Sequence, residues 1–378
     1  MENPVKTIGI LTFHYAHNYG AMLQTYALRT YLIQQGYDVH IINYRSQYVA
    51  SPYKEHYSAL QLVGRRGFVL PWHWIDTVKK LSQVHLYQAK WMDRIEKFSQ
   101  FEKDYLLDSG CTPIAKEEIE RLNYDAFIFG SDQIWNTSII GEDETVYWGK
   151  FQVEPKKKIV YGASVLRKVL TPLEQHNVKQ CLDTFDAVSV RERSLSEQIE
   201  KITGRRVPVV VDPTMLLLRE DYERLVDSAG TSEQPYTLLY MMWESKEAIK
   251  AAKKIGLPLK IVGCRGNELV RDMLPGKILD AGPIEFLNLV SHASYVLTNS
   301  FHGTIFSILF QRPFCVIFGD DARIDNLLNL TGLQKARVPN ARSFSPECLV
   351  QSTEKNVQKL KEAISFSKQY LSDALNCK

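Results

Sequence analysis

The sequence lacks the features that mark several classes of protein. Its 46 lysines and arginines nearly balance 43 aspartates and glutamates, a formal net charge of +3, so charge gives no argument for a nucleic-acid partner. Its six cysteines in 378 residues are too few for a disulfide scaffold, and they are widely spaced with no C-x-x-C pair, which favours reduced thiols. The nine histidines form neither H-x-x-x-H nor H-E-x-x-H, so we predict no metal site and no redox cofactor.

No segment has the character of a membrane span or of a leader. Residues 286–311 carry no charge, but polar side chains such as Asn288, His292 and Thr298 are spread through them, at a high cost in hydrocarbon. The N-terminus leads straight into an apolar strand without a signal core, so we expect a cytoplasmic protein. With 45% apolar residues and 378 residues in all, the chain is globular and long enough for two or three domains.

Short apolar runs alternate with segments of helical periodicity in both halves of the chain, which is typical of doubly wound α/β folds. Strands are expected at 7–13, 39–42, 126–129, 159–161, 187–190, 207–211, 237–241, 259–262, 278–280, 295–297 and 314–317, with a last helix at 354–371. We therefore predict two Rossmann-like domains that face each other across a cleft.

The domain limits follow from where this alternation stops. Residues 1–215 form the first domain, with an aromatic, helical insertion at about 46–120, and residues 236–350 form the second. Gly230, Ser232 and Pro235 are breakers that mark the connection between them. Residues 351–378 are expected to form a C-terminal helix that packs back on the first domain.

Two polar loops follow expected strands of the first domain, where ligands bind in open α/β sheets. The loop 14–20 (HYAHNYG) is not G-x-G-x-x-G, so it gives no support for a dinucleotide, and Asn18 could simply cap the next helix. The loop 129–136 (FGSDQIWN) offers a carboxylate, amides and an indole, which suit a sugar; alternatively Asp132 is a cap and Trp135 belongs to the core. The residues we assign to a sugar acceptor are His17, Asn18, Tyr19, Gly20, Gln133, Trp135 and Asn136.

Two further strand ends predict an anion site. Arg191 follows the strand 187–190, where its planar guanidinium could bind a phosphate or carboxylate, whereas Arg193 suits a surface ion pair with Glu197 or Glu192. His302 lies between the strand ending near Thr298 and the next helix, beside free N–H groups. Arg323 is either a second anion contact or an ion-pair partner of Asp320.

Six segments, in order and over most of the chain, resemble the polysaccharide pyruvyl transferase family. They are TIGILTFHYAHNYGAMLQTYAL, FIFGSDQIWN, YGAS, AVSVRERS, VVVDPTMLL and VLTNSFHGTIFSILFQRPF. The resemblance implies a fold similar to two-domain (GT-B type) glycosyltransferases. It also implies phosphoenolpyruvate as donor and a pair of sugar hydroxyls as acceptor, on a surface or capsular polysaccharide or its lipid-linked precursor. The product would be a pyruvate ketal.

The resemblance also implies roles for individual residues. Arg191 matches a donor-binding arginine and His302 a histidine at the donor site, whereas Ser300-Phe301-His302 stands where many members carry Arg-Leu-His. Arg323 is the candidate replacement for the missing arginine. The predicted phosphoenolpyruvate site contains Arg191, Ser300, Phe301, His302, Gly303, Thr304 and Arg323, with His302 as acid and Asp132 as base.

Two other functions remain open on the sequence. A nucleotide-sugar glycosyltransferase of the same build would also use an arginine and a histidine at a helix end, and a non-catalytic carbohydrate-binding protein would use the polar loops alone. The segment 64–74 (GRRGFVLPWHW) combines basic and aromatic residues, which predicts a peripheral contact with the inner membrane face; an aromatic satellite core is the alternative.

Overall fold

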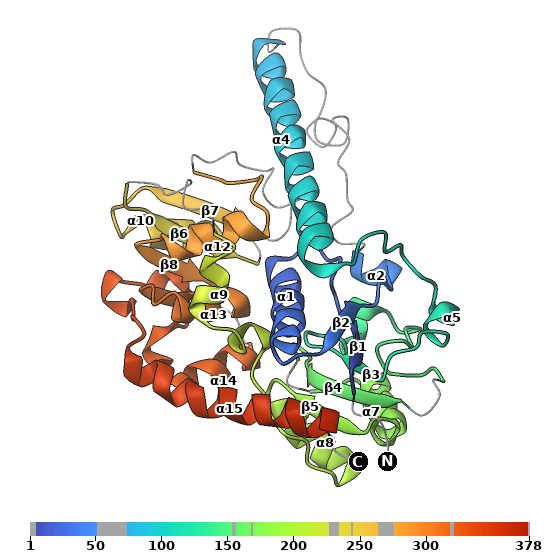
Figure 1. Cartoon of the computed structure of the whole chain (residues 1–378). Coiled ribbons are helices and arrows are strands. Elements are labelled where there is room, and N and C mark those ends of the chain that lie inside the picture. Colours follow the sequence, from blue (N-terminus) through green and yellow to red (C-terminus); the bar gives the residue numbers. More distant parts are fainter. Residues whose placement is uncertain are drawn as a thin grey trace.

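The first of two parallel five-stranded sheets lies in the N-terminal half of the chain (Figure 1). The computed structural model describes residues 5–50, 74–152, 156–167, 169–226, 234–242, 245–263, 276–317 and 321–376. The strands of this sheet are β1 (Thr7–Leu11), β2 (Asp38–Ile41), β3 (Ala126–Phe129), β4 (Lys157–Ala163) and β5 (Ala187–Val190). Their order is β2-β1-β3-β4-β5, with every pair parallel. All four residues of β3 are buried, as expected for a strand covered on both faces.

The second sheet repeats this order in the C-terminal half. Its strands are β6 (Thr237–Met241), β7 (Leu259–Gly263), β8 (Tyr295–Thr298), β9 (Phe314–Ile317) and β10 (Arg337–Val338). Reading β7-β6-β8-β9-β10 reproduces the order of the first sheet. In each sheet the strand order reverses at one point, between β1 and β3 in the first sheet and between β6 and β8 in the second. In open α/β sheets, ligands bind beyond the carboxyl ends of the strands at such a point. These findings confirm the predicted pair of Rossmann-like domains.

Helices cover both sheets and connect their strands. In the N-terminal half they are α1 (Tyr19–Gln34), α2 (Gln47–Ala50), α4 (Trp74–Phe101), α5 (Lys116–Ile119), α6 (Thr137–Ile140), α7 (Pro172–Cys181) and α8 (Arg193–Thr203). In the C-terminal half they are α9 (Arg219–Glu223), α10 (Lys246–Lys253), α12 (Pro283–Ser291), α13 (Phe301–Leu309), α14 (Ala322–Thr331) and α15 (Glu354–Asn376). A π-helical turn, Glu102–Leu106, continues α4.

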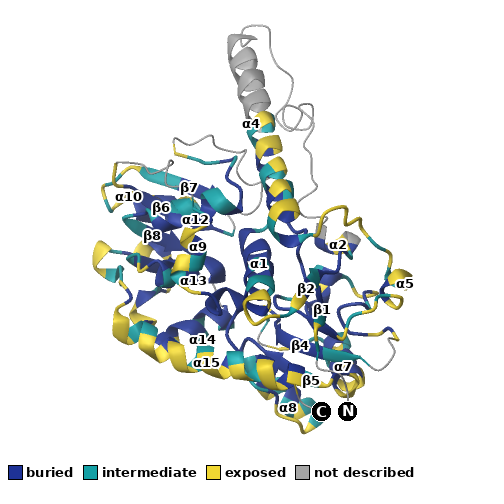
Figure 2. Cartoon of the chain, viewed as in Figure 1, coloured by how far each residue is buried: buried dark blue, intermediate teal, exposed yellow. Residues whose placement is uncertain are grey.

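Helix α1 lies between the two domains and is buried along most of its length (Figure 2). The Tyr19 ring stacks on Phe286 of α12, with centroids 4.5 Å apart and planes 13° apart, and it also packs against Tyr240 of β6. One cluster of buried apolar side chains therefore runs from the first sheet through α1 to α12 and α13. Because this contact is apolar and continuous, the two domains share part of their core.

Two long helices also join the domains. Helix α4 projects from the body at its N-terminal end (Figure 1) and contacts α12 at its other end, where Lys97 forms an ion pair of 3.0 Å with Glu285. Helix α15 crosses from α14 to β4. On the N-terminal domain, Ser367 Oγ accepts from the Val211 N–H at 2.9 Å and the Tyr370 hydroxyl donates to the Val160 carbonyl at 3.2 Å.

Two expected strands are wrong. Residues 207–211 make a single bridge, Val209 to Val190, because Pro208 has no N–H and the N–H of Val211 is taken by α15. Residues 278–280 likewise stop at one bridge between Lys277 and Ile261, and Lys97 of α4 binds the carbonyl of Asp280 at 2.9 Å. The short strand β10 was not expected from the sequence.

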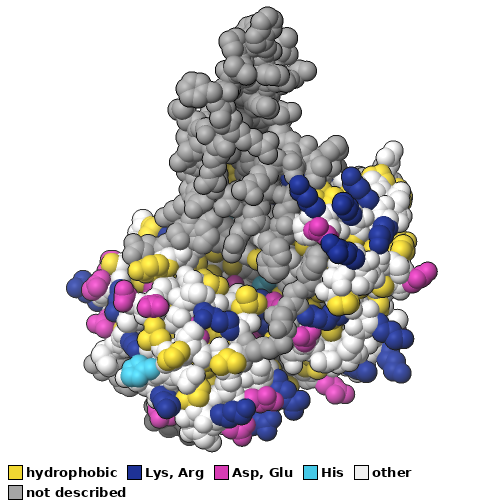
Figure 3. All heavy atoms as spheres, turned by 180° about the vertical axis from the view of Figure 1, so that it is seen from behind, with side chains coloured by type: hydrophobic (Ala, Val, Ile, Leu, Met, Phe, Trp, Pro, Cys, Tyr) yellow, Lys and Arg dark blue, Asp and Glu magenta, His cyan; other side chains and the backbone are white. Residues whose placement is uncertain are grey.

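The described surface and helices bear on the expected location of the protein. On the face shown in Figure 3, acidic and basic side chains both occur over the described residues. Among those residues, no helix combines the length and the apolar character needed to cross a bilayer. The segment 64–74, predicted to contact the membrane face, lies outside the residues whose side chains are described.

The docking of α15 predicts a measurable asymmetry between its two faces. Leu371 is 1% exposed within the shared core, so Leu371→Ala should lower the free energy of unfolding by about 2–5 kcal/mol. Phe366 on the same helix is 51% exposed, and Phe366→Ala should change the free energy of unfolding by less than about 0.5 kcal/mol. Denaturant unfolding of both variants measures this difference, and equal losses would contradict the docking described here.

Candidate active site

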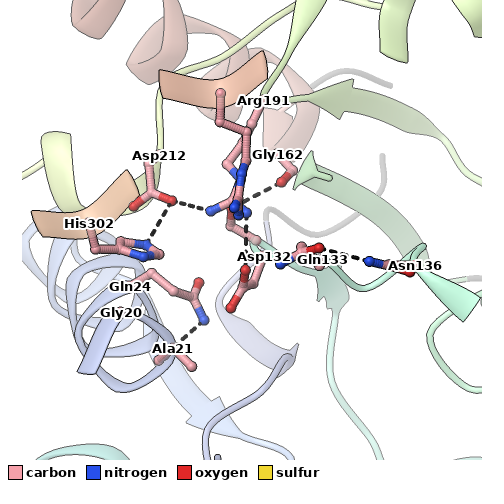
Figure 4. A network of polar contacts seen from close by, with 12 residues as sticks. Gly20, Ala21, Gln24, Asp132, Gln133, Asn136, Gly162, Arg191, Asp212 and His302 are labelled. Atoms are coloured by element: carbon pink, nitrogen blue, oxygen red, sulfur yellow. Dashed lines mark hydrogen bonds and ion pairs between the residues drawn. The ribbon is translucent and has the colours of Figure 1, made fainter. Parts of the chain in front are cut away.

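A buried arginine joins two carboxylates where the two domains meet (Figure 4). Arg191, directly after β5, has 3% of its surface exposed. Its Nη2 donates to Oδ1 of Asp132 at 3.0 Å, and its Nη1 donates to Oδ2 of Asp212 in a short contact. Among the described residues, Nε of Arg191 has no hydrogen-bond partner. The guanidinium predicted at this strand end is therefore held in a fixed plane, and its Nε–H has no hydrogen-bond partner among the described residues.

Asp212 is the site residue that our sequence reasoning missed. Its Oδ1 accepts from the N–H and the hydroxyl of Thr214, at 3.0 and 2.6 Å, while its Oδ2 faces Arg191 and His302. Burial alone would raise the pKa of Asp212, but the positive charges of His302 and Arg191 outweigh it and hold the pKa well below its usual range. The signal was present in the sequence, because Asp-Pro-Thr after the apolar run 207–211 is a helix-capping pattern at a chain turn.

His302 reaches this cluster from the other domain. It lies in the first turn of α13, with 7% of its surface exposed, and its Nε2 is 3.4 Å from Oδ2 of Asp212. This is an ion-pair distance for the protonated ring, although Nε2 makes no hydrogen bond of good geometry to a described residue. A Cβ added to Gly20 would lie 2.0 Å from Nδ1 of His302. Gly20 thus leaves the space that the imidazole occupies, a different role from the acceptor contact predicted for it.

Asp132 belongs to a loop with an unusual backbone. Its φ of 77° lies in the left-handed region, which Asp tolerates better than most residues. The loop is fixed from both sides: the Ser131 hydroxyl donates to the carbonyl of Gly162 at 2.9 Å, and the Thr12 hydroxyl donates to the carbonyl of Ser131 at 3.2 Å. Asp132 therefore faces Arg191 in a defined position at the carboxyl end of β3.

A second arginine lies on the same ring as Arg191. The guanidinium carbons of Arg191 and Arg323 are 5.3 and 5.2 Å from the centroid of Phe301. Arg323 is paired with Asp321 through Nε at 3.0 Å and Nη2 at 2.7 Å, so its partner is the neighbour of the expected Asp320. Both arginines line a cleft of about 620 Å³, whose wall includes the backbone of residues 207–212.

The helix N-terminus beside His302 does not provide the anion contacts that the sequence predicted. Ser300 is the N-cap of α13, and its Oγ accepts from the N–H of Gly303 at 3.3 Å, while its carbonyl accepts from the N–H of Thr304 at 3.0 Å. A Cβ on Gly303 would lie 2.5 Å from Oγ1 of Thr298, so this glycine faces the core. The prediction for Gly303 and Thr304 is wrong because the protein itself satisfies these donors.

The structure also corrects part of the predicted acceptor set after β3. Trp135 is 1% exposed and stacks on Trp148, with ring centroids 5.4 Å apart, so its faces are not available to a sugar. Asn136 caps α6: its Oδ1 accepts from the N–H and hydroxyl of Ser138 and from Arg167. Gln133 is partly exposed, and its Oε1 accepts from Asn136 Nδ2 at 2.8 Å.

The predicted acceptor residues in the loop after β1 also differ in whether the protein already uses their side chains. Asn18 caps α1 by accepting from the N–H groups of Gly20 and Ala21, which was the alternative open on the sequence. Tyr19 is fully buried in the shared core. His17 remains partly exposed and is the member of this loop that still suits a ligand contact.

A buried carboxyl next to Arg191 carries a strongly shifted pKa. Glu192 is 1% exposed; its Oε1 accepts from the N–H of Val165 at 2.7 Å, and its Oε2 has no partner among the described residues. Burial raises the pKa of Glu192 to about 7, although the charge of Arg191 and the Val165 N–H oppose the shift. Glu192 can therefore exchange a proton near neutral pH.

The site as a whole brings together positively charged groups and groups that can carry a proton. Two guanidiniums, an imidazole and four buried carboxylates lie within one connected set of contacts. Within the described part of the chain, no three His, Cys, Asp or Glu side chains come together as a metal-binding group. The arrangement suits acid–base chemistry on an anionic substrate.

The raised pKa of Glu192 predicts how the free energy of unfolding depends on pH. Because the folded state holds a proton that the unfolded chain releases between pH 4.5 and about 7, this carboxyl lowers stability as pH rises through that window. Glu192→Gln should raise the free energy of unfolding at pH 8 by roughly 1–3 kcal/mol and leave it near the parent value at pH 4.5. Denaturant unfolding at both pH values measures this, with the exposed Glu197→Gln as control; a gain that does not depend on pH would contradict it.

The fit of Gly20 to His302 predicts coupling across the domain boundary. Gly20→Ala should lower the free energy of unfolding by about 1–3 kcal/mol, since the added methyl group overlaps the imidazole. In a His302→Ala background the same change should be neutral or stabilising, because alanine is the better helix former. A double-mutant cycle measures the coupling, and purely additive effects would show that the two residues do not meet.

Comparison with known proteins identifies a family for this chain. The model of the family described as polysaccharide pyruvyl transferase matches residues 18–318. No curated protein matches the chain. The UDP-GlcNAc 2-epimerase of Methanocaldococcus jannaschii, in complex with UDP-GlcNAc and UDP, is 14% identical with a TM-score of 0.47, covering 95% of this chain and 92% of that one.

Two other solved structures resemble the chain over nearly its whole length. The UDP-GlcNAc 2-epimerase of Neisseria meningitidis, bound to UDP-GlcNAc, is 12% identical with a TM-score of 0.46, covering 99% of this chain and 94% of that one. A spinosyn rhamnosyltransferase complexed with spinosyn aglycone is 11% identical with a TM-score of 0.37, covering 97% and 95%. The family match includes Asp132, Arg191, Asp212 and His302, whereas Asp321 and Arg323 lie just beyond it. The chain therefore belongs to the polysaccharide pyruvyl transferase family.

Proposed function

We propose that this transferase moves the carboxyvinyl group of phosphoenolpyruvate onto two hydroxyls of one sugar, forming a pyruvate ketal in polysaccharide biosynthesis. The observation that carries the proposal is the convergence of Arg191 and His302, from opposite domains, on Asp212. A fixed guanidinium and a titratable imidazole beside a cleft are what an enol phosphate requires. Family membership supports the same chemistry.

The two arginines form the donor site in this proposal. They lie against one ring, Phe301, and line the same cleft, so a phosphate and a carboxylate of one molecule can each meet a guanidinium. Arg323 thereby stands in for the arginine absent at position 300. Since three aspartates already pair with these arginines, the incoming anion has to share them, and a protonated Glu192 lowers the repulsion.

The reaction needs one acid, one base and a leaving group. His302 delivers a proton to the methylene carbon, which becomes a methyl group, while the first sugar hydroxyl attacks the neighbouring carbon and Asp132 accepts its proton. The bond from this carbon to the phosphate oxygen then breaks, and phosphate leaves with the proton that Asp132 accepted. The second hydroxyl attacks the same carbon to close the ketal, and its proton returns to His302. Overall, donor and diol give ketal and inorganic phosphate, with no change in oxidation state and no redox cofactor.

The acceptor approaches from the carboxyl ends of β1 and β3 in this proposal. Of the predicted acceptor set, His17, Asn18 and Gln133 are partly exposed there, and Asn18 is engaged as the cap of α1. Asp132, the proposed base, lies on the same loop as Gln133, so a hydroxyl held by the amide can reach the carboxylate. A polysaccharide repeat unit or a lipid-linked precursor would present such a diol.

The proposal is tested by incubating the protein with phosphoenolpyruvate and candidate oligosaccharides. Release of inorganic phosphate together with an acceptor mass increased by one ketal-linked pyruvate is the expected result. Release of a nucleoside diphosphate from a sugar nucleotide, with no use of phosphoenolpyruvate, would instead establish the glycosyltransferase alternative. Sugar binding without turnover of either donor would establish a binding protein.

The donor role of Arg191 is tested with a variant that keeps the charge. Removing Arg191 would leave two carboxylates unpaired in the protein interior, so truncation mixes loss of binding with loss of stability. Arg191→Lys keeps a cation but loses the planar fork, and should raise the phosphoenolpyruvate concentration for half-saturation about tenfold. Arg193→Lys, at an exposed position, is the control. Unchanged saturation in Arg191→Lys would remove this residue from the donor site.

A further inference from the structure

A third buried arginine, at the end of α4 that contacts α12, has no carboxylate partner among the described residues. Arg94 of α4 is fully buried, and its Nη1 donates to the hydroxyl of Tyr19 in a short contact. Its guanidinium carbon lies 4.6, 5.4 and 5.0 Å from the ring centroids of Tyr19, Trp91 and Phe98. No ion pair joins Arg94 to an acidic residue in the part of the chain that the structure describes, which is unusual for a buried cation.

The three rings do not satisfy this guanidinium. An aromatic face attracts the cation from above or below its plane, whereas the N–H groups point outward within the plane. Both Nε and Nη2 of Arg94 are buried with no hydrogen-bond partner among the described residues. Two adjacent donors on one edge of a guanidinium are the pair that a carboxylate or phosphate accepts in the bidentate geometry.

Three carboxylates that lie beside α4 or its extension are paired with other cations. Glu285 lies 3.0 Å from Lys97, Asp280 lies 3.4 Å from Lys90, and Glu102 lies 2.8 Å from Arg45. None of these three carboxylates forms an ion pair with Arg94 in the described part of the chain.

His17 belongs to the same aromatic cluster as Arg94. Its ring packs on Phe98, with centroids 5.3 Å apart, and the guanidinium carbon of Arg94 lies 5.0 Å from the centroid of the same ring. Its Nδ1 is buried without a partner among the described residues, although the residue as a whole is partly exposed. Burial, together with the charges of Arg94 and Arg45, lowers the pKa of His17 to about 4, so the ring is neutral at pH 7 and can offer one N–H.

We infer that Arg94 and His17 form a subsite for an anionic oxygen group, a carboxylate or a phosphate, on the acceptor sugar. The group accepts from Nε and Nη2 of Arg94 and from Nδ1–H of His17, and it neutralises the buried charge. The subsite is distinct from the cluster around Arg191. It lies where the loop after β1, helix α4 and residues 280–286 of the other domain meet, since Tyr19 also bonds the carbonyl of Ala281 at 3.0 Å.

The inference relies on the proposed function only in naming the ligand an acceptor; binding of the anion does not depend on it. Two sources share the required chemistry: the carboxylate of an acidic sugar and the phosphate that links a sugar to a carrier. The probes are therefore glucuronate and glucose 1-phosphate, with glucose as the neutral comparison. Titration calorimetry of the full chain at pH 7 measures each affinity.

Arg94→Gln should weaken binding of at least one anionic probe tenfold or more, because charge-assisted hydrogen bonds are lost. Arg94→Lys, which keeps the cation among the rings but loses the fork, should fold like the parent and show a smaller loss. Lys90→Gln removes a charge from the same helix without touching the rings, and should leave affinity unchanged. Preference for glucuronate or for glucose 1-phosphate in the parent identifies the source of the group.

Arg191→Lys separates this subsite from the proposed donor site. It should leave the Arg94-dependent binding of the probes intact. If Arg191→Lys abolishes binding of both probes while Arg94→Gln and Arg94→Lys bind as the parent does, the inference is overturned and the donor site stands. If neither probe binds the parent more tightly than glucose does, the subsite does not exist, whatever the outcome of the pyruvylation assay.

Discussion

The charge of Arg191 is the constraint on which the site depends. A guanidinium buried between Asp132 and Asp212 is stable only while both carboxylates stay in place. The two aspartates come from different segments, since Asp132 follows β3 and Asp212 lies beyond β5. Asp212 in turn contacts His302, which follows β8 of the second sheet, so one ion cluster fixes the relative position of side chains from both domains. The loop around Asp132, the turn at Thr214 and the glycine at position 20 all serve this placement.

The shared core explains how two domains can hold such a cluster. Both sheets have the same strand order, so their ligand-binding edges lie at equivalent points, and α1 fills the space between them with apolar side chains. Helices α4 and α15 add contacts at both ends of this interface. Unlike two domains joined only by a linker, this pair buries a continuous apolar surface, so opening of the cleft has to disrupt packing around Tyr19 and Phe286.

Sequence reasoning singled out several side chains that the structure brings together, but not the contacts that each of them makes. Arg191 and His302 could be found because parallel strands deliver their following residues to one edge of a sheet. The same reasoning failed for Trp135, Asn136 and Gly303, because a polar loop at a strand end must first satisfy its own backbone and fill its own core. Arg94 could not be found at all, since its position against Tyr19 and Phe98 depends on how a helix of the insertion packs on a loop far away in sequence.

The central claim is that the cluster of Arg191, Asp212 and His302 binds the donor. A crystal structure of the protein with phosphoenolpyruvate tests it most directly. The account predicts that an oxygen of the donor lies within hydrogen-bond distance of Arg191, that another lies near Arg323 or His302, and that Asp132 has moved to share its contact with the arginine. A donor bound elsewhere, with the contacts of Arg191 to both aspartates unchanged, would contradict the account.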